Sequence, residues 1–438
     1  MCGFYYSNKQ PIDYDFADVL QRGFDYKVYS CDDYFAIQSV LPCVAMTDWS
    51  LYDSKDYLFL YTGEIYNFDR VFSSDTEQVF NDLINNNDIR HYNGMYAYVL
   101  YNKKTKQLRY GRDKTGQIPL FIYDHDGHIV ISNTIKSIVK TVRTQPNINS
   151  LNLWKTSKHY IFRETPWQGI MSVEPYSEEP DYPHDTVDNT FRKMQDDYKS
   201  NLQSASVNSG GIDSGIVSRW FGDFQIAVNH IGKDFVSSNL DFALDVTQED
   251  WCNYVDEFIE ATYLFPYTWS WVGYYIMGKH LHNKVNILYT GEGADEIFGG
   301  YPDYAKRVRT PYSLPFPIDE SNFLINNKLS DQKYFIPTAA MGANLALGCW
   351  TIEPRAPFLD RRFMNDKQNA YEDNKNSLKE CYRRLYNKAP LPKQGFGGFP
   401  NEYYNHVFGT NIDSFDSNDF WKDAAYERLN SLYEIRKS

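Results

Sequence analysis

Alternating hydrophobic and polar residues predict that the first 142 residues are built mainly from strands. Two predicted hairpins join short runs of this kind, and the second turns at Asp126-Gly127, a strong hairpin signal. The predicted single strands are Cys2–Ser7, Phe35–Val40, Cys43–Trp49 and Tyr57–Tyr61, and the predicted hairpin strands are Met95–Tyr101 with Gln107–Gly111 and Leu120–Tyr123 with Ile129–Ser132.

One helix is well marked within this strand-rich region. Residues 74–77, Ser-Asp-Thr-Glu, have the form of a capping box, which satisfies the first free N–H groups of a helix. Val79, Phe80, Leu83 and Ile84 then recur at helical spacing. We expect a helix to begin at Ser74 and to bury this face.

The second half of the chain has a different period. Residues 143–190 hold five prolines and no regular pattern, which places a junction between two domains there. Beyond it, helical periods alternate with short strand-like runs such as Ile226–Ile231 and Val285–Tyr289, which favours a parallel, doubly wound sheet. We predict a first domain at residues 2–142, a junction at 143–187 and a second domain at 188–438.

Composition narrows the functional classes. A chain of 438 residues with 42% hydrophobic and 23% charged residues is an ordinary globular protein, and a net charge of −13 argues against a nucleic-acid partner. Six cysteines without CxxC spacing, and no secretory signal, predict reduced thiols in the cytoplasm. The longest uncharged stretch, Ala261–Gly278, contains Pro266 and several hydroxyl side chains, so we expect a buried helix and loop and no membrane span.

A cysteine at position 2 has two interpretations. It is either a small residue after the initiator methionine, or the amino terminus that remains once Met1 is removed. In the second case its α-amino group, with a pKa of about 7.7–8.0, acts as general base for its own thiol, with a pKa of about 8.5. Such a nucleophile needs no His or Asp partner.

The segments that follow favour the second interpretation. They are residues 62–67 (Thr-Gly-Glu-Ile-Tyr-Asn), 74–77, 93–97 (Asn-Gly-Met-Tyr-Ala) and 112–120 (Arg-Asp-Lys-Thr-Gly-Gln-Ile-Pro-Leu). In this order they resemble the class II, N-terminal-nucleophile glutamine amidotransferases, which have an αββα fold. The resemblance implies that Cys2 attacks glutamine, that Thr62 and Gly63 lie at the oxyanion, and that Glu64 and Asp75 hold the glutamine amino group.

Two positions depart from that family pattern. Thr62 stands where the family has an asparagine oxyanion donor, and Cys43 stands where it has an arginine for the glutamine carboxylate. Arg22 is a candidate replacement for the missing arginine. The resemblance therefore implies a glutaminase whose activity is weakened.

A phosphate-binding loop is predicted at residues 209–214, Ser-Gly-Gly-Ile-Asp-Ser. Two glycines allow backbone N–H groups to point at an anion at the start of a helix, and Asp213 is suited to Mg²⁺. Three later segments carry further charged groups among glycines and prolines: residues 289–301 with Glu292 and Asp295, residues 353–360 (Glu-Pro-Arg-Ala-Pro-Phe-Leu-Asp), and residues 393–397 with Lys393.

These segments together resemble the asparagine synthetase family, whose second domain is a doubly wound α/β ATP pyrophosphatase of the adenine nucleotide alpha-hydrolase type. The resemblance implies that ATP and pyrophosphate lie on Ser209, Gly210, Gly211, Asp213, Ser214 and Gly291. It further implies that Asp213 and Asp295 bind Mg²⁺, and that Glu292 and Lys393 are catalytic. Glu292 favours amidation by ammonia, since related β-lactam-forming synthetases carry Tyr there.

The resulting prediction is a glutamine-dependent asparagine synthetase that uses ATP and Mg²⁺ and forms AMP and pyrophosphate. Its partners are small molecules, with no nucleic acid and no membrane. The alternatives are a different carboxylate acceptor, an ammonia-dependent synthetase with a weakened glutaminase site, and a non-catalytic binding module. The sequence leaves the oligomeric state open, with a homodimer as the candidate.

Overall fold

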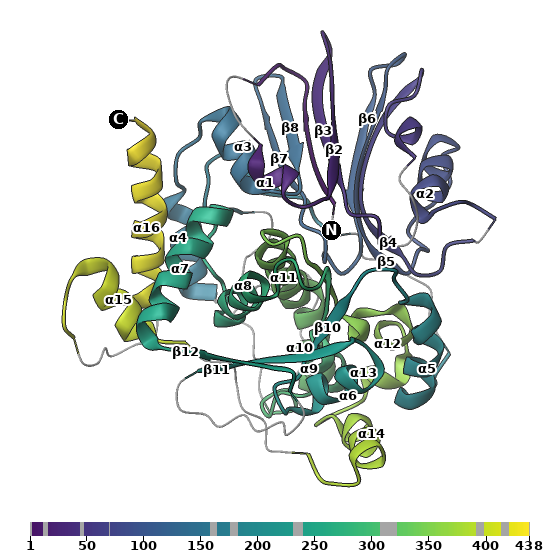
Figure 1. Cartoon of the computed structure of the whole chain (residues 1–438), viewed down its shortest axis with the longest axis vertical. Helices are drawn as coiled ribbons and strands as arrows, with labels where there is room; N and C mark the ends of the chain where they lie inside the picture. Colours follow the sequence, from purple (N-terminus) through teal and green to yellow (C-terminus); the bar gives the residue numbers. More distant parts are fainter. Residues whose placement is uncertain are drawn as a thin grey trace.

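The structure is a computed structural model of the chain, and it describes residues 2–11, 16–43, 48–69, 71–157, 164–175, 183–230, 240–306, 322–390, 398–412 and 420–437. Figure 1 shows two layered regions in contact. Two facing sheets with flanking helices form the upper region, and a third sheet with helices on both faces forms the lower one.

The upper region is a sandwich of antiparallel sheets. Its six-stranded sheet has the order β2-β3-β1-β8-β7-β9, and its three-stranded sheet has the order β4-β5-β6. Apolar side chains from the facing sides of both sheets form the core between them. The strands are β1 (Gly3–Ser7), β2 (Asp25–Cys31), β3 (Tyr34–Val40), β4 (Tyr57–Ile65), β5 (Gly94–Asn102), β6 (Leu108–Arg112), β7 (Phe121–His125), β8 (His128–Ser132) and β9 (Ile170–Ser172).

Helices cover the two outer faces of this sandwich. The helices α1 (Ala17–Leu20) and α3 (Ile135–Val142) pack on the six-stranded sheet, and α2 (Asp75–Ile84) packs on the three-stranded sheet. The side chain of Ser74 accepts a hydrogen bond from the N–H of Glu77, so α2 begins where its sequence predicts. The order helix, sheet, sheet, helix is the predicted αββα arrangement.

The lower region is built on five parallel strands in the order β12-β11-β10-β13-β14. One face packs against α7, α8 and α11, and the other against α5, α6 and α14, so the predicted doubly wound sheet is confirmed. The strands are β10 (Ser204–Val207), β11 (Phe224–His230), β12 (Phe242–Val246), β13 (Ile287–Tyr289) and β14 (Glu353–Arg355).

The remaining helices complete this region and the segment before it. A five-residue π-helix, Asp331–Phe335, joins α10 to α11. The remaining helices are α4 (Ile148–Ser157), α5 (Val187–Asp197), α6 (Ile212–Trp220), α7 (Gln248–Thr262), α8 (Trp269–Leu281), α9 (Ala294–Phe298), α10 (Phe323–Ser330), α11 (Ile336–Gly348), α12 (Arg361–Met364), α13 (Lys367–Ala370), α14 (Asn376–Tyr386), α15 (Pro400–Phe408) and α16 (Phe420–Lys437).

Some predicted elements differ from the structure. The run Cys43–Trp49 is not a strand where it is described: Asp48 caps a 3₁₀ turn at Trp49–Leu51, and residues 44–47 lie outside the described residues. The segment predicted as an irregular junction contains α4 and also β9, which joins the edge of the first sheet beside β7. Strand β2 carried no recognised signal, because most of its residues are exposed.

The long uncharged stretch is a buried helix and loop, as predicted. Most of α8 is buried against α7 and α11 in the core of the lower region. No helix in the described part of the chain combines the length and the apolar character that a bilayer crossing requires.

Candidate functional site

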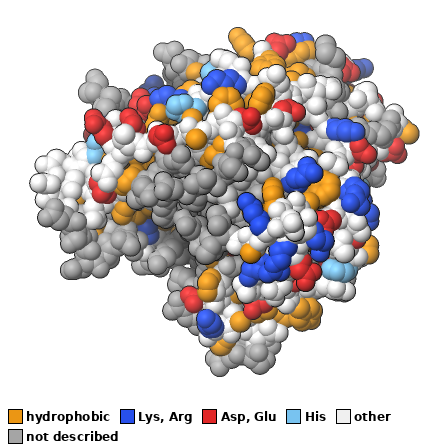
Figure 2. All heavy atoms as spheres, turned by 60° about the horizontal axis from the view of Figure 1, so that its bottom comes forward, with side chains coloured by type: hydrophobic (Ala, Val, Ile, Leu, Met, Phe, Trp, Pro, Cys, Tyr) orange, Lys and Arg blue, Asp and Glu red, His pale blue; other side chains and the backbone are white. Residues whose placement is uncertain are grey.

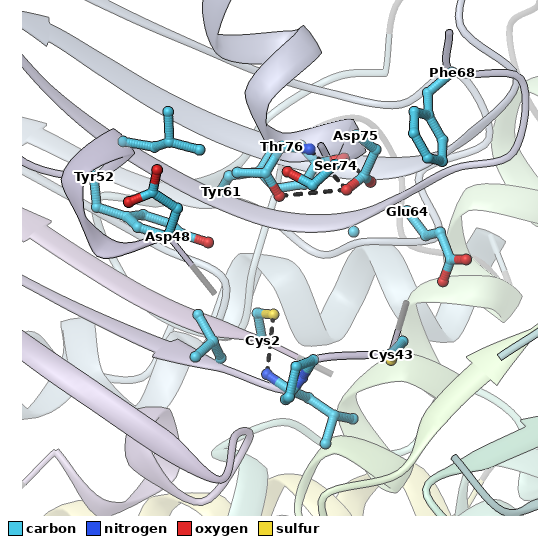
Figure 3. A pocket seen from close by; sticks show the side chains of 15 residues that line it. Cys2, Cys43, Asp48, Tyr52, Tyr61, Glu64, Phe68, Ser74, Asp75 and Thr76 are labelled. Atoms are coloured by element: carbon cyan, nitrogen blue, oxygen red, sulfur yellow. Dashed lines mark hydrogen bonds between the residues drawn. The ribbon is translucent and has the colours of Figure 1, made fainter. Parts of the chain in front are cut away.

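A cavity in the upper region opens beside Cys2, where the ends of β3 and β4 meet the start of α2 (Figure 3). Figure 3 shows Cys2 on one wall and Ser74, Asp75 and Thr76 on the opposite wall. The residues that line the cavity are Cys2, Val40, Leu41, Pro42, Cys43, Asp48, Leu51, Tyr52, Tyr61, Gly63, Glu64, Phe68, Ser74, Asp75 and Thr76.

The backbone of Cys2 is held by three donors. Its carbonyl oxygen accepts hydrogen bonds from Thr62 Oγ1 at 2.9 Å, from Arg22 Nε at 3.2 Å and from Asn133 Nδ2 at 3.2 Å. Its sulfur accepts the N–H of Leu41 at 3.3 Å. Burial raises the pKa of the Cys2 thiol, and the hydrogen bond from the Leu41 N–H opposes that rise. The residue is therefore fixed in place with its sulfur facing the cavity.

Thr62 and Gly63, the two predicted oxyanion residues, occupy different positions. Thr62 is fully buried, and its hydroxyl is directed at the carbonyl of Cys2; it does not line the cavity. Gly63 does line it. Its φ is +138°, and a Cβ there would lie 2.1 Å from the carbonyl oxygen of Met95, so only glycine fits this position.

Asp75 lies at the first turn of α2 and faces the cavity. One carboxylate oxygen accepts the N–H of Ile65 at 3.0 Å and the hydroxyl of Tyr61 at 3.1 Å, and the other accepts the N–H of Thr76 at 2.7 Å. Burial raises the pKa of Asp75 and these hydrogen bonds oppose the rise. The carboxylate is thus held rigidly at the edge of the cavity.

Glu64, the other predicted ligand of the glutamine amino group, is paired with an arginine from the lower region. Arg355 on β14 forms an ion pair with Glu64 and a second one with Glu353, whose Oε1 lies 2.9 Å from Arg355 Nε. It also donates to the carbonyl of Tyr198 at 2.8 Å. Arg355 is fully buried, so both ion pairs are shielded from water. Burial raises the pKa of Glu64 to about 8, and Arg355 opposes that rise.

Cys43 belongs to the same buried cluster. Its sulfur lies 3.7 Å from Glu353 Oε2, and the ligand atoms of Cys43, Glu64 and Glu353 all lie within 4.8 Å of one another. Such a set of atoms could hold a metal ion, but the guanidinium of Arg355 already supplies the positive charge among these carboxylates.

Arg22 does not reach the cavity. Besides the Cys2 carbonyl it contacts Asn344 Oδ1 on α11 at 2.6 Å, so it links the two regions. Among the described residues that line the cavity there is no Lys, Arg or His. The structure therefore offers no described cation for a ligand carboxylate at this cavity.

The predicted phosphate loop, residues 209–214, connects β10 to α6. The side chain of Ser214 accepts the N–H of Ser209 at 3.1 Å, and Asn208 Oδ1 accepts the N–H of Gly210 at 3.2 Å. Gly210 has a φ of +78°, a conformation that favours glycine, and Gly211 caps α6 without a side chain. The helix N-terminus is therefore left available to an anion.

Two carboxylates meet beside this loop. Lys375 Nζ lies 2.5 Å from Asp213 Oδ2 and 2.6 Å from Asp295 Oδ1, so the predicted pair is brought together on one buried cation. Gly291 follows β13 and passes close to the loop, because a Cβ there would lie 3.0 Å from the Cβ of Asp213. Carboxylate oxygens are ligands that Mg²⁺ prefers, and in this structure Lys375 supplies the positive charge between them.

The side chain of Glu292 is held by a hydrogen bond from a tyrosine of α8. The hydroxyl of Tyr274 on α8 donates to Glu292 Oε1 at 2.6 Å. Burial raises the pKa of Glu292, and Asp295 and Asp213 add to that rise. The predicted catalytic Lys393 lies outside the described residues.

Sequence reasoning missed three residues of these sites. Lys375 precedes α14 in a segment with no recognisable motif, and Tyr274 lies in an apolar helix. Arg355 was part of a recognised motif, but its contact with Glu64 joins residues 291 apart in the chain. No local pattern predicts such a pairing.

Basic and acidic side chains are mixed on the surface formed by α5 and α14. Figure 2 shows Lys and Arg side chains gathered on the right of this face, where Figure 1 places α5 and α14. Three of these basic side chains are paired with carboxylates: Lys193 with Asp185, Lys199 with Asp196 and Arg384 with Asp188. The exposed basic residues on and beside these helices are Arg192, Lys193, Lys199, Arg383, Arg384 and Lys388.

Family models match both regions of the chain. A glutamine amidotransferase domain matches residues 2–177, and an asparagine synthase domain matches residues 234–335. Among solved structures, a B. subtilis glutamine phosphoribosylpyrophosphate amidotransferase covers 47% of this chain and 60% of its own, at 13% identity. Its TM-score of 0.26 is too low to support a structural argument.

Three curated relatives extend the match. Asparagine synthetase B of Escherichia coli is 24% identical over 62% of this chain and 53% of its own length. A putative asparagine synthetase of Methanocaldococcus jannaschii is 23% identical over 60% of this chain and 63% of its own length. A probable asparagine synthetase of Dictyostelium discoideum is 24% identical over 86% of this chain and 76% of its own length. All three are described as glutamine-hydrolysing, and the alignments span about half to three quarters of their lengths. The chain therefore combines a region that matches a glutamine amidotransferase domain with one that matches an asparagine synthase domain, and it is similar to glutamine-hydrolysing asparagine synthetases over much of its length.

Proposed function

We propose that the chain is a glutamine-dependent asparagine synthetase. In this proposal Cys2 releases ammonia from glutamine, aspartate is adenylylated by ATP, and ammonia attacks the acyl-adenylate to give asparagine, AMP and pyrophosphate. The observation that carries the proposal is the pairing of two sites in one molecule: a half-buried cysteine at a cavity, and the Asp213–Asp295 pair beside a glycine loop.

The first half-reaction uses groups at the cavity. After removal of Met1, the α-amino group of Cys2 takes the thiol proton, and the sulfur attacks the amide carbon of glutamine. The tetrahedral oxyanion is stabilised by a backbone N–H donor at Gly63. Ammonia leaves with the transferred proton, and water then hydrolyses the thioester to glutamate. Asp75 holds the glutamine ammonium, and Glu64 does so when Arg355 releases it.

The second half-reaction uses the parallel sheet. The loop at residues 209–214 presents N–H groups and the α6 N-terminus to the pyrophosphate of ATP. Asp213 and Asp295 have the oxygen ligands that Mg²⁺ prefers and would hold it, and Mg²⁺ when bound neutralises phosphate charge. Glu292 orients ammonia or accepts its proton, and Lys393 balances charge at the α-phosphate. Separation of this site from water would limit hydrolysis of the acyl-adenylate.

An ammonia-dependent synthetase with a weakened glutaminase is the second candidate. Three observations favour it: the Thr62 hydroxyl is used by the Cys2 carbonyl, Glu64 is paired with Arg355, and the described cavity lining has no basic residue. A different carboxylate acceptor is the third candidate, because the match to E. coli asparagine synthetase B covers 53% of that protein.

Pyrophosphate release with a panel of carboxylates separates these candidates. The proposal predicts release with aspartate and Mg·ATP, with either glutamine or ammonia as nitrogen source. Release with ammonia alone would support the second candidate, and release with another carboxylate only would support the third. No pyrophosphate release with any carboxylate would overturn the proposal.

A further inference from the structure

A second cavity of the upper region lies at the edge of the sandwich away from Cys2. It borders β6, the edge strand of the three-stranded sheet, and β9, the edge strand of the six-stranded sheet. Among the described residues it shares no lining residue with the cavity at Cys2, which borders β3 and β4. Its volume is about 500 Å³, a size typical of sites for small organic molecules.

Aromatic and apolar side chains form most of the walls of this second cavity. Tyr96 and Tyr98 of β5 and Tyr110 of β6 line it. Ile122 of β7 and Met171 of β9 also line it, and they are opposite each other in the sheet register. Phenol rings beside a continuous apolar surface favour a planar ligand, which can pack against the rings.

Arg112 is the charged side chain in the described lining that is deeply buried, with 5% of its surface exposed. Its guanidinium makes two long hydrogen bonds, from Nη1 to the carbonyl of Ile118 at 3.4 Å and from Nη2 to Ser172 Oγ at 3.4 Å. Its Nε has no hydrogen-bond partner within the described part of the chain. Burial lowers the pKa of Arg112 to about 10, which is the direction expected for a cation removed from water.

The carboxylate next to Arg112 in the chain is used elsewhere. Asp113 accepts the N–H of Gln117 at 3.1 Å, the N–H of Ile118 at 3.2 Å and the hydroxyl of Thr115 at 2.7 Å. It therefore stabilises the turn after β6, and Arg112 forms no ion pair with any described residue. A buried cation without a direct counter-ion is costly, and an anionic ligand would reduce that cost.

The other charged residues at this cavity limit the charge of such a ligand. Asp124 and Glu174 line it and are exposed, and Arg90 is exposed and paired with Asp88. A polyphosphate would bring several negative charges near the two acids. A carboxylate carries a single charge, which Arg112 matches, and its two oxygens lie in one plane as the guanidinium donors do.

We infer that this cavity binds a small aromatic carboxylate, with the carboxylate on Arg112 and the ring against the tyrosines. The cavity contains none of the residues assigned to the two half-reactions, so the inference does not depend on the proposed function. The ligand would be a molecule other than glutamine, aspartate or ATP.

A matched acid and amide test the recognition of charge. 2-Naphthoate and 2-naphthamide have the same ring system, and only the first carries a negative charge. Titration calorimetry of the full chain is expected to give a dissociation constant of about 1 mM or lower for 2-naphthoate, and binding of the amide at least about ten-fold weaker. Binding of 2-naphthoate is expected to persist with saturating Mg·ATP, and with glutamine added to Cys2→Ala.

Substitution of the arginine separates recognition from folding. Arg112→Gln is expected to weaken 2-naphthoate about 10- to 100-fold and to leave 2-naphthamide unchanged, because only the acid uses the charge. Arg109→Gln is the matched control, since Arg109 lies on the other face of β6 and donates to the carbonyl of Leu83 at 2.8 Å. Circular dichroism of each variant establishes that it is folded.

A second variant leaves the buried arginine in place. Tyr110→Ala, at a position that is 39% exposed, removes one aromatic wall and is expected to weaken both probes about 2- to 10-fold. Tyr26→Ala, which removes an exposed tyrosine of β2 outside the cavity, is expected to leave both affinities unchanged.

Four results would overturn the inference. They are no binding of 2-naphthoate at about 5 mM, equal affinity for the acid and the amide, equal weakening of both probes by Arg112→Gln, and unchanged affinities in Tyr110→Ala. Displacement of 2-naphthoate by ATP or glutamine would place it in a substrate site and would also contradict the inference. Tighter, Arg112-dependent binding of AMP would assign the cavity to a phosphate instead of a carboxylate.

Discussion

The cavity at Cys2 and the loop at Asp213 both bring carboxylates into buried surroundings, but their balancing cations come from different places. At the cavity, Glu64 is balanced by Arg355, which belongs to the other region of the molecule. At the loop, Asp213 and Asp295 are balanced by Lys375 from the same region. A buried carboxylate without such a partner would be strongly destabilised.

The difference bears on how each site depends on the rest of the chain. Asp213 and Asp295 are organised by residues within about 160 positions of one another, in one sheet and its helices. Glu64, which lines the cavity, is contacted by Arg355 of β14 across the contact between the regions. We therefore expect substitutions at the loop to affect the lower region alone. Substitutions at the Glu64–Arg355 contact are expected to affect both regions.

The largest expected effect is on the use of glutamine as the nitrogen source, which depends on the upper site. Cys2→Ala is expected to lower glutamine-driven pyrophosphate release by at least about 10⁴-fold, because a lost nucleophile has no substitute. Ammonia-driven release is expected to stay near the wild-type rate, since the lower site is untouched. Cys31→Ala, which removes an exposed thiol, is the matched control. Equal loss with both nitrogen sources would show that Cys2 is needed for the fold.

Substituting each balancing cation, Arg355 or Lys375, tests how far the stability of its region depends on it. Arg355→Gln is expected to lower the free energy of unfolding by about 3–5 kcal/mol, because Glu64 and Glu353 remain buried without a partner. Lys375→Gln is expected to cost less, since the side chains of Asp213 and Asp295 are 24% and 20% exposed.

Urea unfolding of both variants measures the difference. Arg361→Gln is the control, since Arg361 also crosses between the regions but donates to backbone carbonyls of Arg90 and His91. A larger loss of unfolding free energy for Lys375→Gln than for Arg355→Gln would contradict this expectation.

Asp295→Asn is expected to affect the lower site alone. Pyrophosphate release should fall about 10²–10³-fold with either nitrogen source, the size expected when one preorganised electrostatic group is lost. Glutaminase activity, measured as glutamate release, should be unchanged. Asp196→Asn, at an exposed salt bridge with Lys199, serves as the control. A matching fall in glutaminase activity would show that the sites are not separable in this way.

Thr62→Val tests the support of the nucleophile. The hydroxyl donates to the Cys2 carbonyl at 2.9 Å, and loss of one such hydrogen bond is worth about 1 kcal/mol. Glutamine-driven turnover is expected to fall by up to about ten-fold, with ammonia-driven turnover unchanged. A fall of 10³-fold would instead indicate that Thr62 contacts the reacting atoms.

The last expected effect is a pH dependence of the stability of the lower region. Burial, with Asp295 and Asp331 nearby, raises the pKa of Glu296 to about 8 from an ordinary value of 4.5. The folded state therefore binds this proton more tightly, and the associated stability is lost as pH rises from about 4.5 through about 8. The free energy of unfolding should fall more steeply over this range in the wild type than in Glu296→Gln. Glu380→Gln, which is exposed, should behave as the wild type. Parallel slopes for all three proteins would contradict this assignment.

Local patterns predicted most of the fold. Residues 121–132 form a hairpin that turns at Asp126-Gly127, both with positive φ, and α2 begins at Ser74, because such signals lie within a few residues of the elements they define. The helix–strand alternation likewise predicted the parallel sheet. Strand β2 was missed because it is exposed on both faces, so no buried face imposes a pattern.

The candidate sites were predictable in their motifs but not in their pairings. The convergence of Asp213 and Asp295 follows from two loops at the same edge of a parallel sheet. The roles of Lys375 and Arg355 depend on packing between distant segments, which no local spacing encodes. Thr62 was expected at the oxyanion, and its contact with Cys2 emerges only once β4 is placed beside the start of β1.

Transfer of labelled nitrogen tests the central claim most directly. The chain would be incubated with Mg·ATP, aspartate and glutamine carrying ¹⁵N in its side-chain amide, and products measured by mass spectrometry and ³¹P NMR. The account predicts ¹⁵N-labelled asparagine with AMP and pyrophosphate in equal amounts, and no labelled asparagine from Cys2→Ala. Formation of ADP and phosphate, or labelled asparagine from Cys2→Ala, would contradict it.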